Sequence, residues 1–339
     1  MQEFPMAGFV GEREQDDSAT AVITLHPRHP GMMARGAARR LGAPSQKPDV
    51  AASLEPVAGR PQPADAPYLE LDLSFSPSDQ ALWCYMKPDG PPSFTPGMVR
   101  ELTRLHAWLA QPERMPGHQR PRFYVMGSRI PGIYNLGGDL AFLVDSIRAG
   151  NKAALTSYAH GCIEAVHAIY NGFGAPVISI GLVEGNALGG GLEGALCFHV
   201  LVAERGVKMG FPEVLFGSFP GMGAYSFLSR KLGARAAERM IMDGRIHTSE
   251  QLFEMGIVDV LAEPGHGRAA VEKWIADNRS RHALHHSMNR VRERVAPIAL
   301  QELRDVTDIW VETALALEAS DLRRMERLQA AQTRSARRN

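Results

Sequence analysis

The chain has 339 residues, of which 45% are hydrophobic and 22% charged, and these proportions suit a globular protein with a sizeable core. Lys plus Arg and Asp plus Glu are equal at 37 each, so neither a basic surplus for nucleic acid nor an acidic solvating tail is indicated. The three cysteines, Cys84, Cys162 and Cys197, form no metal pattern or disulfide framework, and no apolar run reaches the ~20 residues of a membrane helix, so we expect a cytoplasmic protein without a metal, membrane or nucleic-acid partner.

The first 65 residues differ in composition from the rest of the chain. They contain eight prolines and many Ala, Gly and Arg, and only residues 21–25 resemble a strand. Such a segment buries too little apolar surface to offset its ordering entropy. We therefore predict a disordered Pro/Ala/Arg-rich extension over 1–65, a core domain over 66–262 and a helical region over 263–339.

The predicted core alternates strands and helices. Strands are expected over 68–75, 81–86, 122–126, 177–183, 199–203, 207–209 and 258–261. Helices are expected over 95–110, 137–149, 151–170, 223–232, 234–242 and 249–255, and further ones over 266–279, 282–295, 299–317 and 320–332. The order predicts an α/β core followed by a helical C-terminal part.

A glycine-rich stretch after the strand 177–183 is the strongest candidate for chemistry. Gly189 to Gly191 enter a predicted helix, Glu193 lies just inside it, and Glu213 follows twenty residues later. Glycines at a helix N-terminus expose backbone N–H groups to a ligand, and two carboxyl groups close by can move protons. The combination indicates chemistry on a carbonyl group.

Other readings of the same residues have less support. The run Gly189 to Gly194 formally fits the dinucleotide fingerprint G-x-G-x-x-G, but five residues separate it from the strand, and Glu193 would face a pyrophosphate. No G-x-S-x-G or Walker A sequence is present. The histidines at 282, 285 and 286 have no cysteine nearby, so solvated side chains are favoured over a metal site.

Several segments resemble a known family. GNALGGGLE, FPEVLF and FPGMGAY are similar to the crotonase (enoyl-CoA hydratase/isomerase) family, over about residues 68–261. NLGGDLAFLVDSIRAG, YAHGCIEAVHAIYNGFG, GFPEVLFGSFPGMGAYS and DLRRMERL resemble the diffusible signal factor (DSF) synthases, crotonase relatives that make cis-2-unsaturated fatty acid signals. The resemblance implies the crotonase spiral of ββα units in two stacked sheets. It also implies a homotrimer or hexamer, with the C-terminal helices at an interface or acting as a lid.

The resemblance assigns roles to matching residues. An oxyanion hole for a thioester carbonyl would use the backbone N–H groups of Gly138 and Gly190, with Gly137 adjacent; tight turns without a catalytic role are the alternative. Glu193 and Glu213 match both acid/base positions of the hydratases. In dehydration Glu213 would take the α-proton and Glu193 would protonate the departing hydroxyl. A helix-start Glu and an exposed loop Glu would be the non-catalytic alternative.

An acyl pocket is expected around these turns. Its predicted lining is Leu136, Phe142, Leu143, Val214, Leu215, Phe216, Phe219, Met222 and Tyr225, for each of which core packing is the alternative. The substrate would arrive on acyl carrier protein or CoA, with no other cofactor. Candidate contacts for an acidic carrier are Arg129, Arg148, Lys152, Arg230 and Lys231.

Three functions remain open at this point. The first is a DSF-synthase-like enzyme that dehydrates a medium-chain 3-hydroxyacyl thioester and hydrolyses the thioester to a free cis-2-unsaturated acid, a quorum-sensing signal. The second is a conventional enoyl-CoA hydratase of fatty acid metabolism. The third is a non-catalytic binding protein of the same fold that docks a sensor kinase, against which the intact Glu193 and Glu213 pair argues.

Overall fold

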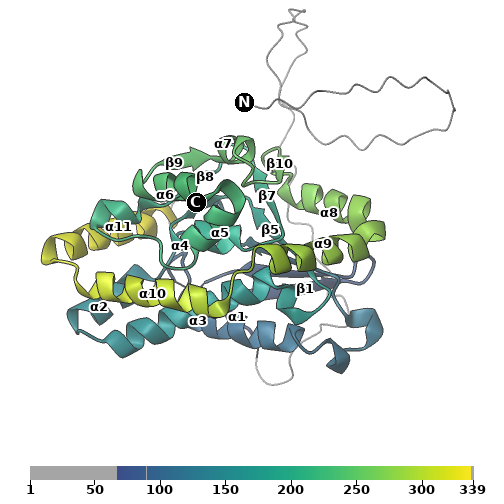
Figure 1. Ribbon diagram of the computed structural model, residues 1–339, viewed down its shortest axis with the longest axis horizontal. Helices are drawn as coiled ribbons and strands as arrows, with labels where there is room; N and C mark the ends of the chain where they lie inside the picture. The colour runs from purple at the N-terminus through teal and green to yellow at the C-terminus, as the bar shows by residue number, and fades with distance from the viewer. Residues whose placement is uncertain (1–66, 89, 337–339) are drawn as a thin grey trace, which may run out of the picture. The chain divides into compact units, whose positions relative to one another are not determined.

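The computed structural model describes residues 67–88 and 90–336 (Figure 1). By its internal contacts the chain divides into Met1–Pro56 and Val57–Asn339, and all of the described residues belong to the second unit. The disordered extension predicted for residues 1–65 lies outside the described residues.

The larger of two sheets forms the frame of the molecule. Its strands, in spatial order, are β1 (Leu71–Ser76), β2 (Ala81–Met86), β3 (Phe123–Ser128), β5 (Ile178–Val183), β7 (Val200–Glu204) and β10 (Val260–Ala262). β1 pairs antiparallel with β2, and all the other pairs are parallel. Each of these strands lies within or next to a stretch predicted from the sequence.

Helices surround both sheets. The α-helices are α1 (Pro96–Leu109), α2 (Leu140–Arg148), α3 (Lys152–Tyr170), α4 (Gly190–Leu196), α5 (Ala224–Leu232), α6 (Ala234–Met242), α7 (Ser249–Glu254), α8 (Gly267–Asn278), α9 (His282–Val295), α10 (Leu300–Leu315) and α11 (Ala319–Ala336). Short 3₁₀ helices are η1 (Pro112–Arg114), η2 (Gly117–Gln119), η3 (Gly172–Gly174), η4 (Pro212–Phe216) and η5 (Arg279–Arg281). The predicted helix starts are confirmed at two caps, since Thr95 accepts from the Met98 N–H and Asn151 from the Ala154 N–H.

The inner strands of the large sheet, β2, β3, β5 and β7, are buried on both faces. Side chains alternate between faces along a strand, so Leu82 and Cys84 of β2 join the core cluster that includes α1 and α3 residues. Trp83 and Tyr85 point the other way, into a second cluster with Val271 of α8. This two-sided burial explains why the strands read as continuous apolar runs.

The smaller sheet has four strands of three residues each, in the order β4 (Ile133–Asn135), β6 (Asn186–Leu188), β8 (Lys208–Gly210) and β9 (Ile246–Thr248). β4, β6 and β8 are parallel, and β9 is antiparallel to β8. The sequence analysis found β8 but missed β4, β6 and β9, because three residues are too few to display an alternating pattern. The predicted α/β fold of two sheets with a helical C-terminal part is confirmed.

The connection between the sheets repeats three times. The chain passes from β3 to β4, from β5 to β6 and from β7 to β8, each time leaving the large sheet for the small one. The carboxyl ends of parallel strands meet at one edge of a sheet. The segments that follow β4, β6 and β8 are therefore brought together, and these are the segments that carry Gly138, Gly190 and Glu213.

The last two helices return to the first half of the domain. α10 packs against α3, and α11 packs against α2 (Figure 1). Among the described residues, no helix combines the length and the apolar character that crossing a bilayer requires.

Candidate active site

Two glycine turns meet at the edge of the small sheet. A Cβ placed on Gly190 would lie 3.2 Å from the Gly137 Cα atom and 3.5 Å from the Gly138 nitrogen. Gly137 has a φ of +98°, and a Cβ there would lie 3.0 Å from the Gly190 nitrogen. A side chain on Gly137 would therefore strain the backbone and push the two turns apart.

The backbone N–H groups of Gly138 and Gly190 are available at this junction. Neither of them donates a hydrogen bond to another group in the described part of the chain. Gly190 is the first residue of α4, where N–H groups have no partner within the helix. Gly137 differs, because its N–H donates to Asn135 Oδ1 at 2.8 Å. Gly137 therefore shapes the turn, and its own N–H, which is bonded to Asn135, is not available to an oxyanion.

Three side chains that the sequence analysis did not assign hold the first turn. Asn135, 1% exposed, bonds to Gly137, and Asp139 caps α2 by accepting from the Ala141 N–H. The Tyr158 hydroxyl accepts from the Asp139 N–H at 3.2 Å and donates to the Phe94 carbonyl. The Gly138 N–H is therefore held in place from both sides of the turn.

Glu213 enters the site from the third parallel strand. The Gly189 N–H donates to the Gly210 carbonyl at the end of β8, at 2.8 Å, and Pro212 then starts η4 with Glu213 in its first turn. A Cβ on Gly189 would lie 2.6 Å from Glu213 Oε1. Glu213 Oε2 is buried and has no hydrogen-bond partner among residues 67–88 and 90–336.

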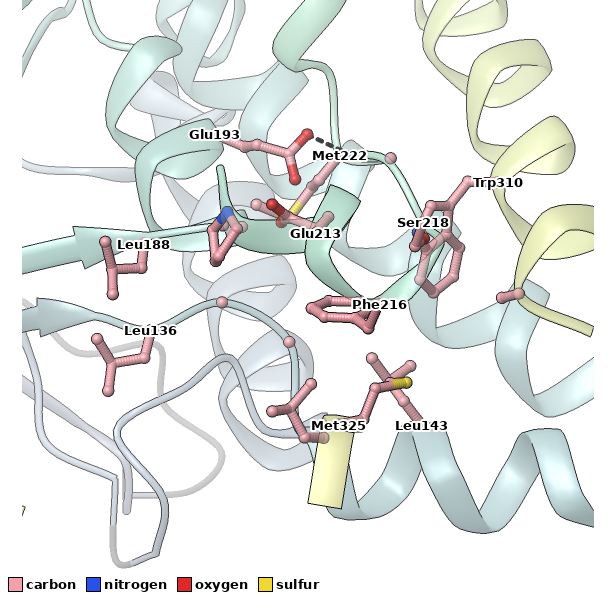
Figure 2. A pocket seen from close by; sticks show the side chains of 18 of the residues that line it. Leu136, Leu143, Leu188, Glu193, Glu213, Phe216, Ser218, Met222, Trp310 and Met325 are labelled. Carbon is pink, nitrogen blue, oxygen red and sulfur yellow. Dashed lines mark hydrogen bonds between the residues drawn. The ribbon is translucent and has the colours of Figure 1, made fainter. Parts of the chain in front are cut away.

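Glu193 has different surroundings. It lies in the first turn of α4 and is 2% exposed. Its Oε1 accepts from the Met222 N–H at 2.6 Å and from the Ala224 N–H at 3.0 Å. These donors belong to the loop between Phe219 and the start of α5, so this loop fixes the direction in which the Glu193 carboxyl points (Figure 2).

The two carboxyl groups share one low-dielectric site. Burial raises the pKa of both, and the negative charge of Glu193 raises the pKa of Glu213 further. The N–H groups of Ala224 and Met222 partly offset the rise in the pKa of Glu193. The pair therefore holds a proton near neutral pH, and the protein favours that proton on Glu213. Glu193 accepts from two loop N–H groups, whereas Glu213 Oε2 has no donor among the described residues and only the Glu213 backbone N–H lowers the pKa of that group.

The carboxyl groups lie at a mostly apolar cavity of about 220 Å³. Five residues of the predicted acyl pocket line it: Leu136, Leu143, Phe216, Phe219 and Met222. Gly137, Gly138, Gly190, Glu193 and Glu213 line it as well. Figure 2 shows Leu136 on one side of the carboxyl groups and Phe216 and Leu143 on another.

Four residues predicted for the pocket lie outside its lining: Phe142, Val214, Leu215 and Tyr225. Leu215 is 67% exposed and Tyr225 is 42% exposed, because η4 and α5 turn these positions to the surface. Phe142 packs on the Tyr158 ring, with centroids 5.0 Å apart. These four therefore do not line this cavity, because proximity in sequence to the site does not fix which face of a short helix is turned inward.

The sequence analysis missed the walls supplied by the C-terminal helices. The cavity-lining residues of α10, α11 and the short turn between them are Trp310, Ala314, Leu317, Met325, Leu328 and Gln332. Gln332 Nε2 also donates to the Leu136 carbonyl at 3.3 Å, beside the first glycine turn. The sequence does show helical spacing of apolar residues, at Trp310, Ala314 and Leu317 and again at Met325 and Leu328. Such spacing indicates which helix face is turned inward, but not which part of the protein that face packs against.

Four of the five basic residues suggested for carrier contact form ion pairs within the chain. The pairs are Arg129 with Asp72 (2.9 Å), Arg148 with Glu326 (2.8 Å), Lys152 with Glu312 (3.7 Å) and Arg230 with Glu302 (2.6 Å). Lys231 is exposed. The paired residues are themselves partly exposed, so pairing leaves them able to meet a carrier but lowers the net positive charge that they present.

The described residues contain no cluster of three or more His, Cys, Asp or Glu side chains able to hold a metal ion. His282 bonds to the Arg122 carbonyl at 3.1 Å, and His285 bonds to Asn278 Oδ1 at 3.0 Å. His282 thus joins α9 to the residue before β3, and His285 joins α9 to the end of α8.

Comparison with known proteins agrees with this geometry. Residues 109–307, more than half of the chain, match the family model described as "Enoyl-CoA hydratase/isomerase". The mitochondrial methylglutaconyl-CoA hydratase of Homo sapiens is 29% identical over 209 residues, 61% of this chain and 57% of that protein. The peroxisomal fatty acid beta-oxidation multifunctional protein AIM1 of Arabidopsis thaliana is 38% identical over 102 residues, 30% of this chain and 14% of its own length. The chain therefore spans less than two thirds of these curated relatives.

Solved structures share the fold. Pseudomonas aeruginosa DspI aligns with a TM-score of 0.59 and 23% identity over 68% of this chain and 89% of its own. The enoyl-CoA hydratase from Bacillus halodurans aligns with a TM-score of 0.65 and 17% identity over 76% of this chain and 99% of its own. At these identities the likeness establishes a common fold.

Proposed function

Because the chain belongs to the enoyl-CoA hydratase/isomerase family, we propose that it is a hydro-lyase that dehydrates a medium-chain 3-hydroxyacyl thioester. We further propose that it hydrolyses the thioester and releases a free cis-2-unsaturated fatty acid. The substrate is carried by acyl carrier protein or CoA, and no other cofactor takes part.

One observation carries the proposal. Two buried carboxyl groups, those of Glu193 and Glu213, and two free N–H groups, those of Gly138 and Gly190, line one apolar cavity. An enolate needs donors at its oxygen, and β-elimination needs a base and an acid near the α- and β-carbons. The apolar remainder of the cavity suits an acyl chain.

Dehydration uses each group once. The thioester oxygen accepts hydrogen bonds from the Gly138 and Gly190 N–H groups. Ionised Glu213 takes the α-proton, and protonated Glu193 gives its proton to the β-hydroxyl, which departs as water. The α,β double bond forms, and the shared proton of the pair ends on Glu213.

The protonation state of the Glu193 and Glu213 pair connects dehydration with the reverse reaction, hydration. The proton is favoured on Glu213, because the Glu193 carboxylate accepts from two loop N–H groups while Glu213 Oε2 has no partner in the described part of the chain. That state is the one from which hydration starts. Dehydration starts from the state with the proton on Glu193, which a single proton transfer within the pair reaches, so the same site serves both directions.

Hydrolysis reuses the same groups. A water molecule attacks the thioester carbonyl carbon, a carboxylate of the pair takes a water proton, and the tetrahedral oxyanion lies between Gly138 and Gly190. The carbon–sulfur bond then breaks, the thiolate leaving group takes the proton, and the free acid remains. No additional nucleophile is needed.

The signal-synthase part of the proposal is supported by where its distinctive segments lie. NLGGD supplies the first turn, FPEVLFGSFPGMGAYS supplies Glu213 with the loop that binds Glu193, and DLRRMERL supplies Met325 and Leu328 of the cavity wall. The resemblance to DSF synthases thus includes the residues around the substrate. We also propose the homotrimer or hexamer expected for the family, cytoplasmic location and a sensor kinase as a further partner.

A conventional enoyl-CoA hydratase is the second candidate. It is favoured by the likeness to a curated relative that is itself named as a CoA hydratase, methylglutaconyl-CoA hydratase. The two candidates share Glu193, Glu213 and the N–H pair. They differ in whether the thioester survives.

Product analysis separates the two candidates. Purified protein is incubated with medium-chain 3-hydroxyacyl-carrier protein and with the matching CoA thioester, and products are identified by mass spectrometry with double-bond geometry from chromatography. A free cis-2-enoic acid supports the proposal. Reversible hydration of trans-2-enoyl-CoA without free acid overturns it in favour of the hydratase, and incubation without protein controls for spontaneous hydrolysis.

A further inference from the structure

We infer that Thr307 of α10 is a positioning residue for the acid/base group Glu193, through a single peptide unit of the loop before α5. This inference deepens the proposed function and rests on it for the role of Glu193. Thr307 does not itself line the cavity, but its hydroxyl bonds to Gly221, which does. It acts through the Gly221–Met222 peptide.

The first contact joins that peptide to Glu193. The Met222 N–H donates to Glu193 Oε1 at 2.6 Å, and the Ala224 N–H donates to the same oxygen at 3.0 Å. With Oε1 held by two donors, the rotation of the carboxyl group is fixed. The direction of Oε2 follows from the orientation of the loop backbone.

The second contact joins the same peptide to α10. The Thr307 hydroxyl donates to the Gly221 carbonyl oxygen at 2.7 Å, and Thr307 is 1% exposed. The Gly221 C=O and the Met222 N–H belong to one planar trans peptide and point in opposite directions. Thr307 at one end and Glu193 at the other therefore fix this plane between them, and a hydrogen bond to the carbonyl also polarises the N–H.

The loop needs this restraint because glycines flank it. Gly223 has a φ of +109°, and Gly221 has no side chain to resist a rotation of the peptide plane. A flipped plane would turn the Gly221 carbonyl oxygen toward the Glu193 carboxylate and remove one donor. Trp310 of α10 leaves no room for a residue larger than glycine at position 221, since a Cβ on Gly221 would lie 2.3 Å from Trp310 Cγ.

α10 is itself held in register along α3. Three side-chain contacts run antiparallel along the two helices: the ion pairs of Lys152 with Glu312 (3.7 Å) and of Arg304 with Glu164 (2.7 Å), and the hydrogen bond of His160 with Asp308 (2.8 Å). Val311 and Ala314 of α10 are buried beside them. A C-terminal helix that packs on the first half of the domain thus reaches the catalytic loop through one hydroxyl group.

The variant Thr307→Val tests the inference, because it keeps the shape of the side chain and removes its hydroxyl. We expect kcat to fall about 10-fold, as for loss of one typical hydrogen bond from the transition state, while KM changes less than about 2-fold. We also expect the Glu193 carboxyl to titrate at higher pH, because the Met222 N–H that stabilises its charged form is no longer held in place from the Gly221 side. The other titratable groups that face it are Glu213 and Cys162, which the substitution leaves in place.

Infrared pH titration of the buried carboxyl bands measures this shift without turnover, and the Glu193 band is assigned by its absence from Glu193→Gln. Thr307→Ser, which keeps the hydroxyl, should restore kcat to within about 3-fold and return the band to its place. Thr313→Val is the matched control, since its hydroxyl donates only to the Ile309 carbonyl of the same helix. It should behave like wild type.

The outcomes separate cleanly. Wild-type kcat together with an unmoved Glu193 band in Thr307→Val overturns the inference, as does an equal loss in Thr307→Ser. If Thr307→Val does not fold, Thr307→Ala replaces it in the same comparison. If wild type turns over no thioester, the proposed function fails, and the titration of Glu193 alone then decides whether Thr307 positions it.

Discussion

Glu193 and Glu213 are the same residue type at the same cavity, yet the protein treats them in opposite ways. Glu193 is fixed by two backbone donors from a loop that α10 restrains. Glu213 Oε2 is buried without a partner among the described residues, and Gly189 lies so close to Oε1 that a Cβ there would be 2.6 Å away. One carboxyl is built to hold a charge in a set direction and the other to hold a proton.

The difference shows how one site provides an acid and a base from two identical groups. Burial alone would raise both pKa values together, and the like charges would leave the order of ionisation undefined. Two N–H donors on one side break this symmetry. The bound substrate then determines which carboxyl group is ionised. Ionised Glu213 starts dehydration, and ionised Glu193 starts hydration.

The largest expected effect is on activity when either carboxyl is lost. Glu193→Gln and Glu213→Gln should each lower kcat by about 10³-fold, because each removes one partner of general acid–base catalysis. Gln at 193 can still accept from both N–H groups, so that variant should keep its loop. Steady-state kinetics on the thioester substrate measures the loss, and activity within tenfold of wild type in either variant would remove that group from the mechanism.

A smaller loss is expected when the Glu213 side is disturbed without changing its carboxyl. Gly189→Ala places a Cβ 2.6 Å from Glu213 Oε1 at a φ of +56°. The carboxyl must move aside, and kcat should fall about 10²-fold, the cost that a misplaced group of about 1 Å carries.

Gly150→Ala is the matched control for this change. Gly150 has a φ of +60° and open space around its Cβ position. Both variants should lose about 1–2 kcal/mol of stability from left-handed backbone strain, measured by denaturant titration. Only Gly189→Ala should lose activity; an equal loss in Gly150→Ala would show that strain, and not the position of Glu213, limits the rate.

Much of this arrangement could be predicted from the sequence. The long strands of the large sheet and the capped helices carry strong local patterns, as at Thr95 and Asn151. Glu193 and Glu213 were found because glycines beside carboxyl groups at a helix start are chemically unusual. The first glycine turn, Gly137 and Gly138, was predicted from the family resemblance, and the structure adds the helix cap at Asp139.

The small sheet and the far wall of the cavity could not be predicted, because they depend on contacts between parts of the chain that are distant in sequence. The three-residue strands β4 and β6 carry no readable period, although their pairing is what brings Gly138 to Gly190. Met325 lies more than a hundred residues from Glu213 along the sequence, and its helical spacing says that it faces inward but not that it faces a cavity. Leu215 and Tyr225 were assigned to the pocket because they are close to the site in sequence. Neighbouring residues on a short helix point in different directions, and these two are exposed.

The raised pKa of Glu213 also makes the free energy of unfolding depend on pH. The folded-state pKa of Glu213 is raised above its unfolded value, so its protonated form is the one that folding favours. The stability that this group contributes is complete below about pH 4, its unfolded pKa, and is lost as pH rises through the raised value. Glu213→Gln removes this loss.

We therefore expect Glu213→Gln to gain about 1–2 kcal/mol relative to wild type at pH 9, with the gain shrinking toward pH 4. Glu193→Gln should gain less, because two N–H groups already stabilise the Glu193 charge. Denaturant unfolding across this pH range measures both differences. Equal gains in the two variants, or gains independent of pH, would contradict the asymmetry between the two carboxyl groups.

The smallest effect on turnover is expected at the wall away from the carboxyl groups. Met325→Ala enlarges the cavity and should raise the kcat/KM ratio for chains one or two carbons longer by about 3–10-fold, since each added methylene buries about 0.8 kcal/mol. Leu322→Ala is the matched control: Leu322 is buried on the same helix but does not line the cavity. Both variants lose core packing, so only the change in chain-length preference distinguishes them. The pH profile of kcat should be that of wild type in both, because neither touches the groups around Glu193 or Glu213; a shifted profile in Met325→Ala would mean that the asymmetry of the carboxyl pair depends on how the chain end is held.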